Sequence, residues 1–326
     1  MMIFSARAGL ALASLSLAAI GLAACGNPVE TTDGAPPAVV VGSAADLTSG
    51  EMKLSFVITS RTNAPEAATI EGGSWTVERE LGQTALLVCH PSKLLMFDTG
   101  LGRDIDTQFG DMPFYLKPVF AYDFIGAAVD LVDFDAFCPG RELEIVISHL
   151  HWDHASGIED FAGTPVHVTQ AEREAAHIIK NGAGYLANQT DAKDINWQDI
   201  AFTDTPYASY AQSLDMFGDG RVVLVPMKGH TAGSIGMFVT LDAEQRFFFT
   251  GDITWVVEGF TLPAHKHALM RAIADGDDIS LLETEIARVH ALGQADPDLN
   301  LVPAHDVSAY AAGAIYPDAI ASASLN

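Results

Sequence analysis

Residues 148–154 read SHLHWDH and follow directly on an apolar, strand-like run at 144–148. In an extended segment, His149 and His151 point to the same side of the chain. Two neutral imidazoles at that spacing suit a zinc ion. Asp153 and His154 are neighbours, so a turn of the chain is needed to aim both at a second metal beside the first. The stretch therefore predicts a metal site at the end of a strand.

Three later fragments each place a candidate ligand at the end of an apolar run. They are GHTAGS at 229–234, TGD at 250–252 and PAHD at 303–306. A single histidine near a strand end is more often a surface or core residue than a ligand. Taken together with 148–154, and in this order, the fragments indicate that His230, Asp252 and His305 belong to the same site. The first half of the chain adds FDTG at 97–100, which contains Asp98.

In order and content, these five motifs resemble the metallo-β-lactamase superfamily, and the resemblance covers roughly residues 50–312. The HxHxDH pattern at 149–154 is the most specific of them. The resemblance implies an α/β fold, the αβ/βα four-layer sandwich, with metals in the cleft between two sheets. An arrangement of short β-branched runs alternating with helix-like stretches is consistent with such a protein.

The resemblance also implies a set of seven metal ligands. His149, His151 and His230 would bind the first metal. Asp153, His154 and His305 would bind the second, and Asp252 would bridge the two. Asp98 would orient the site without binding a metal itself. Asp153 and Asp252, the two carboxylates of the set, are the candidate catalytic residues.

Five imidazoles and two carboxylates are suited to two zinc ions, although manganese, iron or cobalt can occupy similar nitrogen and oxygen sites. A metal lowers the pKa of bound water to around 7, so a metal-bridging hydroxide would attack an ester without a serine or cysteine nucleophile. The expected activity is hydrolysis of a small neutral ester. The rival from a different class is a non-catalytic zinc-binding lipoprotein, and the complete ligand set argues against it.

Two kinds of ester remain open. The motifs resemble the lactonase branch, which opens acyl-homoserine lactones. That branch usually has a tyrosine three residues after the bridging aspartate, where this chain has Trp255. An aromatic wall resembles instead the branch that hydrolyses organophosphorus triesters and aryl esters.

The substrate pocket is expected to contain Trp255, Trp152 and Tyr122. Residues 112–124 carry five aromatic side chains and two prolines, which break any long helix there. This segment is either a small core cluster beneath a loop or an apolar lid over a lipophilic substrate.

The N-terminus has the features of an export signal. Residues 1–24 contain Arg7 and a short apolar run, which is typical of a secretory signal peptide. The signal ends in Leu22-Ala23-Ala24-Cys25, which resembles a bacterial lipobox whose cysteine is lipidated. Residues 25–48 would then be the lipidated Cys25 and a flexible tether, and residues 49–326 the hydrolase domain. These features predict a lipoprotein anchored to a membrane in the bacterial periplasm.

Charge and cysteine content limit the partners. The chain has 17 Lys and Arg against 42 Asp and Glu, a formal net charge of −25. So acidic a surface repels phosphate backbones, which excludes nucleic acid as a favoured partner and suits a neutral substrate. The sequence does not indicate the oligomeric state. Cys89 and Cys138 could pair in an oxidising compartment, but Cys89 lies in an apolar run, and we expect two unpaired thiols.

The expected helices span 170–180, beginning near Thr169, and 279–292, stopping at Gly293. The residues between 181 and 220 are expected to be rich in loops. The expected strands fall on either side of that centre, at 52–60, 84–90, 92–98, 144–148, 164–169, 221–227, 235–241, 246–251 and 299–303.

Overall fold

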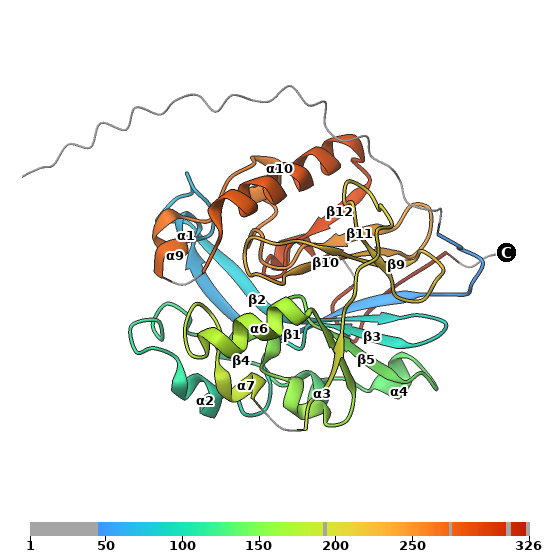
Figure 1. Cartoon of the computed structure of the whole chain (residues 1–326), viewed down its shortest axis with the longest axis horizontal. Coiled ribbons are helices and arrows are strands. Elements are labelled where there is room, and N and C mark those ends of the chain that lie inside the picture. The colour runs from blue at the N-terminus through green and yellow to red at the C-terminus, as the bar shows by residue number, and fades with distance from the viewer. Residues whose placement is uncertain (1–44, 192–193, 274–275, 311–313, 324–326) are drawn as a thin grey trace, which may run out of the picture. The chain divides into compact units, whose positions relative to one another are not determined.

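Two β-sheets form the interior of the protein (Figure 1). The computed structural model describes residues 45–326, apart from 192–193, 274–275, 311–313 and 324–326. The predicted signal segment, the lipobox and residues 25–44 of the tether lie outside the described residues. Among the residues that are described, no helix has the length and apolarity needed to cross a membrane.

The first sheet has eight strands in the order β13-β1-β2-β3-β5-β6-β7, with β4 paired to β1. The pairs β3·β5, β5·β6 and β6·β7 are parallel, and the pairs β1·β2 and β2·β3 are antiparallel. The strands are β1 Lys53–Pro65, β2 Glu78–Cys89, β3 Leu94–Phe97, β4 Asp123–Phe124, β5 Leu143–Val146, β6 Pro165–Val168, β7 Asn196–Asp199 and β13 Ile320–Ala321.

The second sheet has five strands in the order β12-β11-β10-β9-β8. Only β11 and β12 are parallel to one another as neighbours; the other pairs are antiparallel. The strands are β8 Leu214–Asp215, β9 Val222–Pro226, β10 Ile235–Thr240, β11 Arg246–Phe249 and β12 Leu299–Val302.

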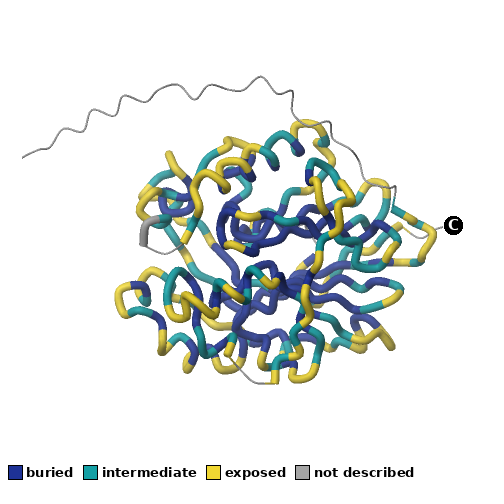
Figure 2. The backbone as a smooth tube through the Cα atoms, viewed as in Figure 1, coloured by how far each residue is buried: buried dark blue, intermediate teal, exposed yellow. Residues whose placement is uncertain are grey.

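The core lies between the two sheets and is built by the alternation of side chains along each strand. In β11, Phe247 and Phe249 join the cluster between the sheets, whereas Phe248 faces outward onto helix α10 (Ile279–Ala295). Phe56 of β1 meets this cluster from the first sheet, and its ring stacks on Tyr310 at 4.1 Å. Figure 2 shows the resulting buried interior, with exposed segments at the periphery.

Helices cover both outer faces, which completes the four layers. The outer face of the first sheet packs against residues of α3 (Ala128–Leu131), α4 (Phe134–Phe137), α5 (Trp152–Ala155) and α6 (Gln170–Ile179). The outer face of the second sheet packs against α8 (Glu258–Thr261) and α10. Figure 1 shows α10 on the opposite side of the sheets from α3, α4 and α6. The predicted αβ/βα sandwich is confirmed. The remaining helices are α1 Glu66–Thr69, α2 Ile105–Gln108, α7 Ala187–Thr190 and α9 Ala268–Ile273.

The predicted start of the first expected helix agrees with the structure, and the predicted end of the second does not. The helix expected at 170–180 is confirmed as α6, and the Thr169 side chain accepts a hydrogen bond from the backbone N–H of Glu172. The stop expected at Gly293 is wrong, because α10 continues to Ala295. A Cβ atom at position 293 would lie 3.1 Å from the Leu301 side chain, so glycine here allows the helix to approach β12 closely.

Cys89 and Cys138 form a disulfide, with Cα atoms 5.5 Å apart. The expectation of two unpaired thiols was therefore wrong. Cys89 ends β2, and Cys138 is buried directly after α4, which packs on the same sheet. The apolar surroundings of Cys89 suggested a buried thiol, but the same cluster contains Cys138, and the two residues are bonded there.

Candidate metal centre

The ends of five strands meet at one edge of the sandwich. Strands β3 and β5 are parallel neighbours, so Asp98 after β3 lies close to residues 148–154 after β5. Strand β9 runs in the direction of β11 because both are antiparallel to β10, and β11 is parallel to β12. Loops after these three strands carry His230, Asp252 and His305. Strand direction thus brings the five motifs to the same edge of the sandwich.

Three histidines form the first cluster. His230 Nε2 lies 3.1 Å from His149 Nε2 and 2.9 Å from His151 Nδ1. The rings of His149 and His151 are 4.5 Å apart, on the same side of the extended segment, as the spacing predicts. All three residues are at most 4% exposed.

A second cluster contains Asp153, His154 and His305, and a third group joins His149, His154 and Asp252. The short helix α5 supplies the turn that aims Asp153 and His154 at the same place. His305 Nε2 lies 2.9 Å from an oxygen of Asp252 and 3.4 Å from an oxygen of Asp153. Asp252 also lies 3.3 Å from His154 Nε2 and 3.8 Å from His230 Nε2. Its carboxylate therefore stands between the two clusters, in the position that the resemblance implies.

Hydrogen bonds on the outer ring nitrogens of His305 and His154 turn their inner Nε2 atoms toward Asp252, the place where a cation would bind. His305 Nδ1 donates to the Gly82 carbonyl, and His154 Nδ1 donates to Asp98, each over 2.8 Å. Asp98 also accepts from the backbone N–H of Ser148 at 2.7 Å and from its hydroxyl at 2.8 Å. Asp98 has a φ of 58°, which is uncommon outside glycine and directs its carboxylate to these donors.

The pKa shifts differ between the two clusters. Burial alone would lower the pKa of His154 and of His305, but Asp252 holds both above the ordinary value, so a cation there would replace a proton. Burial holds the pKa of His149 and of His151 well below the ordinary value, so both are neutral imidazoles with a lone pair to offer. Burial alone would raise the pKa of Asp252, but His305 and His154 hold it well below its ordinary value. Asp252 is therefore an anion at neutral pH.

Unpartnered buried atoms provide a test of whether a metal fits. Among the described residues, the buried atoms His151 Nε2, His154 Nε2 and Asp252 Oδ1 make no hydrogen bond, although the last two lie 3.3 Å apart as an ion pair. Buried polar atoms are nearly always paired, so unpaired atoms on three proposed ligands call for another partner. Divalent cations at the two clusters would satisfy this donor set of imidazole and carboxylate. The residues present therefore fit a pair of metal ions.

Glu172 of α6 holds the ligand loops in place and was not predicted as a site residue. Its carboxylate is fully buried and accepts four hydrogen bonds. One oxygen accepts from the backbone N–H of Leu150 and from the Tyr185 hydroxyl, each over 2.9 Å. The other accepts from the Thr231 hydroxyl at 2.6 Å and from the backbone N–H of Gly233 at 3.0 Å. Glu172 thereby connects the His149–His151 segment to the loop that carries His230.

Lys266 and Asp277 form a buried pair behind His230. The Asp277 carboxylate lies 2.8 Å from His230 Nδ1 and 3.3 Å from the Lys266 ammonium. Burial alone would raise the pKa of Asp277, but Lys266 and His230 hold it below its ordinary value. Asp277 belongs to none of the motifs identified in the sequence. Nothing in the sequence around Lys266 indicates that its side chain is 0% exposed.

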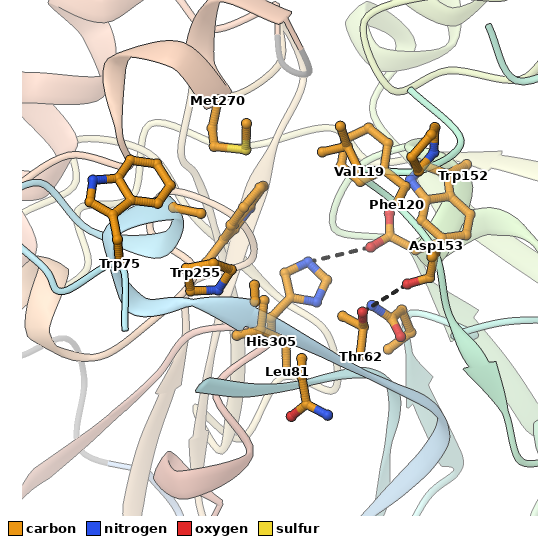
Figure 3. Close-up of a pocket in the computed structure, with 17 residues that line it drawn as sticks. Thr62, Trp75, Leu81, Val119, Phe120, Trp152, Asp153, Trp255, Met270 and His305 are labelled. Carbon is orange, nitrogen blue, oxygen red and sulfur yellow. Dashed lines mark hydrogen bonds and ion pairs between the residues drawn. The ribbon is translucent and has the colours of Figure 1, made fainter. Parts of the chain in front are cut away.

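A cavity of about 300 Å³ opens beside the ligand clusters (Figure 3). Asp153 and His305 reach it from the clusters. Figure 3 shows Trp75, Trp255 and Met270 facing Val119, Phe120 and Trp152 across it. Asp153 and His305 are its titratable residues, and most of the remaining lining is apolar. Sequence reasoning missed Trp75, in the loop before β2, and Met270, in helix α9, because neither belongs to a motif.

Two of the three expected pocket residues line the cavity. Trp255 and Trp152 do, whereas Tyr122 does not. The Tyr122 hydroxyl donates to Asp106 at 2.9 Å, and its ring packs on Trp152 at 5.8 Å. Of the five aromatic residues in 112–124, Phe120 is the one among the described cavity-lining residues, and Phe120 and Tyr122 pack against the small core cluster that contains Trp152. Burial raises the pKa of the Tyr122 hydroxyl, with Asp106 adding to that effect.

Trp255 uses its only hydrogen-bond donor within the site. The indole N–H donates to an oxygen of Asp252 at 3.2 Å. The indole ring presents its apolar surface to the cavity and approaches His305 edge-on at 6.2 Å. The side-chain donor of Trp255 is thus directed at the aspartate that lies between the two clusters.

The fold and the site define a class: an αβ/βα sandwich with a histidine–carboxylate centre between its two sheets. A model of the metallo-beta-lactamase superfamily matches residues 79–305, and the chain belongs to that superfamily. The motif resemblance noted in the sequence is thereby confirmed. The superfamily is usually dependent on two metals, and its lactonase-like members are among the relatives of this chain.

Similarity to known proteins extends over most of the chain. It is 25% identical over 230 residues to the N-acyl homoserine lactonase AttM of Rhizobium johnstonii, covering 69% of this chain and 81% of AttM. It is 29% identical over 239 residues to a probable metallo-hydrolase of Mycobacterium tuberculosis, covering 69% and 74%. A solved N-acyl homoserine lactone hydrolase with N-hexanoyl-L-homoserine at its metal centre superposes with a TM-score of 0.63 at 19% identity. It covers 82% of this chain and 98% of that one.

Proposed function

We propose that this protein is a dinuclear zinc hydrolase that opens neutral lactones bearing an apolar substituent, such as an N-acyl homoserine lactone. The observation that supports this most directly is the position of the cavity. Its largely apolar lining runs up to Asp153 and His305, which belong to one ligand cluster. A substrate with a polar ring and an apolar chain would place the ring at the clusters and the chain among the aromatic side chains.

The residues of the chain divide the work of hydrolysis. His149, His151 and His230 would hold one ion, and Asp153, His154 and His305 the other, with Asp252 between them. Two divalent ions held there would lower the pKa of a coordinated water to about 7 and polarise the ester carbonyl. Asp153 lies in a cluster and also faces the cavity, so its carboxylate is placed to take the proton of the attacking water. It would return that proton to the alkoxide as the ring C–O bond breaks.

The cavity lining favours a neutral substrate. Among the described residues that line it, none is a lysine or arginine, and the net charge of the chain is −25. An anionic substrate would meet neither a cationic partner nor an attractive long-range field. The names of the relatives agree with a lactone, since AttM and the superposed hydrolase both act on N-acyl homoserine lactones.

The second candidate is hydrolysis of aryl esters or organophosphorus triesters. Trp255 favours it, because this residue lines the cavity while its indole N–H donates to Asp252. Trp255 and Trp75 lie across the cavity from Trp152, and together they would form an aromatic slot suited to an aryl leaving group.

We further propose that the protein is exported and anchored by a lipid on Cys25. The lipobox at 22–25 and the apolar segment before it support export. The Cys89–Cys138 disulfide is consistent with an oxidising compartment such as the periplasm. Membrane fractionation of wild type and Cys25→Ser would test the anchor. Wild type recovered wholly in the soluble periplasmic fraction would contradict it.

The activity is tested with purified residues 49–326, stripped with chelator and reloaded with zinc. The panel contains N-acyl homoserine lactones of increasing chain length, aryl acetates and a phosphotriester. We expect about two zinc ions per chain, loss of turnover on chelation, and the highest kcat/KM for lactones. Turnover highest on aryl or phosphorus esters would favour the second candidate. Two bound ions with no turnover on any ester would favour the non-catalytic zinc-binding protein.

A further inference from the structure

Lys266 lies where a cation is unexpected, directly behind a proposed metal ligand. Its side chain is 0% exposed, and its ammonium is 3.2 Å from His230 Nδ1. It is also 3.5 Å from the backbone carbonyl of Asp252 and 5.3 Å from the centre of the Trp255 ring. A buried ammonium beside a site built for divalent cations opposes the binding of those cations unless an anion offsets it.

Asp277 supplies that anion and determines the protonation of His230. A carboxylate can only accept hydrogen bonds, so at 2.8 Å His230 Nδ1 carries the proton and donates it to Asp277. His230 Nε2 is then unprotonated and faces His149 and His151. The other oxygen of Asp277 pairs with Lys266 at 3.3 Å. Lys266, Asp277 and His230 thus form a chain that leads to the three-histidine cluster.

We propose that Lys266 is a positioning residue that offsets the charge of Asp277, and thereby limits how tightly the three-histidine cluster holds its cation. The negative charge of Asp277 makes His230 a more basic ligand. The Lys266 ammonium partly neutralises that charge and so makes His230 less basic. A ligand set that donates less leaves its metal a stronger Lewis acid. This inference rests on the proposed metal centre and adds to it a residue that none of the motifs contains.

The two substitutions are expected to change metal affinity in opposite directions. A merely structural role would predict weaker binding for both. Asp277→Asn removes the acceptor that makes His230 basic, and outer partners of this kind change metal affinity by about 10–100-fold. We expect weaker binding at one of the two sites. Lys266→Met keeps the apolar stem and removes the positive charge, so Asp277 acts on His230 without compensation. We expect tighter binding at that same site, by about tenfold.

The experiment measures the stepwise dissociation constants of the two Co²⁺ ions by competition with a chelator, together with the visible spectrum of bound Co²⁺. The variants are Lys266→Met, Asp277→Asn and the double variant. Lys93→Met is the matched control, because Lys93 pairs with Glu142 at the surface before β3, at the end of the strand away from the site. We expect the spectrum to change for Lys266→Met and to stay unchanged for Lys93→Met.

The double variant keeps the test valid if one single variant does not fold, because it leaves neither charge buried alone. It should bind Co²⁺ more tightly than Asp277→Asn, since only the opposing ammonium separates the two. Two results would overturn the inference. One is an equal Co²⁺ dissociation constant for the double variant and Asp277→Asn, and the other is Co²⁺ binding in Lys266→Met that is no tighter than in wild type. If wild type itself takes up no ion, the proposed function fails instead.

Discussion

Replacing Glu172 with glutamine should weaken both the fold and the metal centre. The wild-type carboxylate accepts four hydrogen bonds, two at each oxygen, and each oxygen accepts one of them from a backbone N–H. A glutamine amide has one oxygen that accepts and one NH₂ group that only donates. Whichever way the amide lies, its NH₂ group faces a backbone N–H, that of Leu150 or that of Gly233.

The magnitude follows from these four bonds. One buried N–H left without an acceptor costs about 1–3 kcal/mol. The bonds that remain lose the charge on their acceptor and weaken by roughly half. A neutral amide is less costly to bury than a carboxylate, which offsets part of this loss. The expected net decrease in the free energy of unfolding is about 2 kcal/mol. Movement of either loop would also displace His149 and His151 or His230, so zinc affinity should fall by about tenfold or more.

Urea unfolding of chelator-treated protein measures the first effect, and zinc competition measures the second. Glu174→Gln is the matched control, because Glu174 lies on the same helix, is exposed and bonds only Gln170 among the described contacts. That control should change stability by less than about 0.5 kcal/mol. If Glu172→Gln unfolds at the same urea concentration as Glu174→Gln and binds zinc equally well, the proposed role of Glu172 is wrong.

Three further substitutions test the site and the fold. Asp252→Ala should lose at least one zinc ion per chain and nearly all activity, with exposed His177→Ala as control; full zinc content by elemental analysis would refute the bridging position. Trp255→Phe removes the donor to Asp252, so kcat should fall by a similar factor, about tenfold, on lactones and aryl esters alike; a loss confined to lactones would mean that the indole contacts the substrate. Cys138→Ser opens a loop with a sequence separation of 49, which should lower the free energy of unfolding by about 2–4 kcal/mol in denaturant, and an unchanged midpoint would contradict this.

Local sequence predicted the parts of the site that depend on local geometry. His149 and His151 share one side of an extended segment, and the turn of α5 aims Asp153 and His154 at the same place, so the spacing indicates that these ligands converge. Ligands farther along the chain were recognisable because each follows an apolar run and the strands end at one edge. The fold class followed from the same order of motifs.

Residues whose role depends on tertiary packing were not predictable in this way. Glu172 and Glu174 are two positions apart on one helix, yet one carboxylate is buried beneath two loops and the other is exposed. Lys266 lies between α8 and α9 and is buried against His230 and Asp277, which come from other parts of the chain. Cys89 and Cys138 meet across a sheet and a helix, and neither local sequence indicates the partner of its thiol.

Each ligand group draws two residues from the stretch after β5 and one from a loop of the second sheet. Occupied clusters would therefore act as cross-links between the two halves of the chain, in addition to their chemistry. A ligand that binds only the folded state adds stability in proportion to the logarithm of its concentration. Amide hydrogen exchange in the strands of the two sheets should consequently slow as zinc is added, most of all in β5 and β11, and the supply of metal would determine how long the protein stays folded.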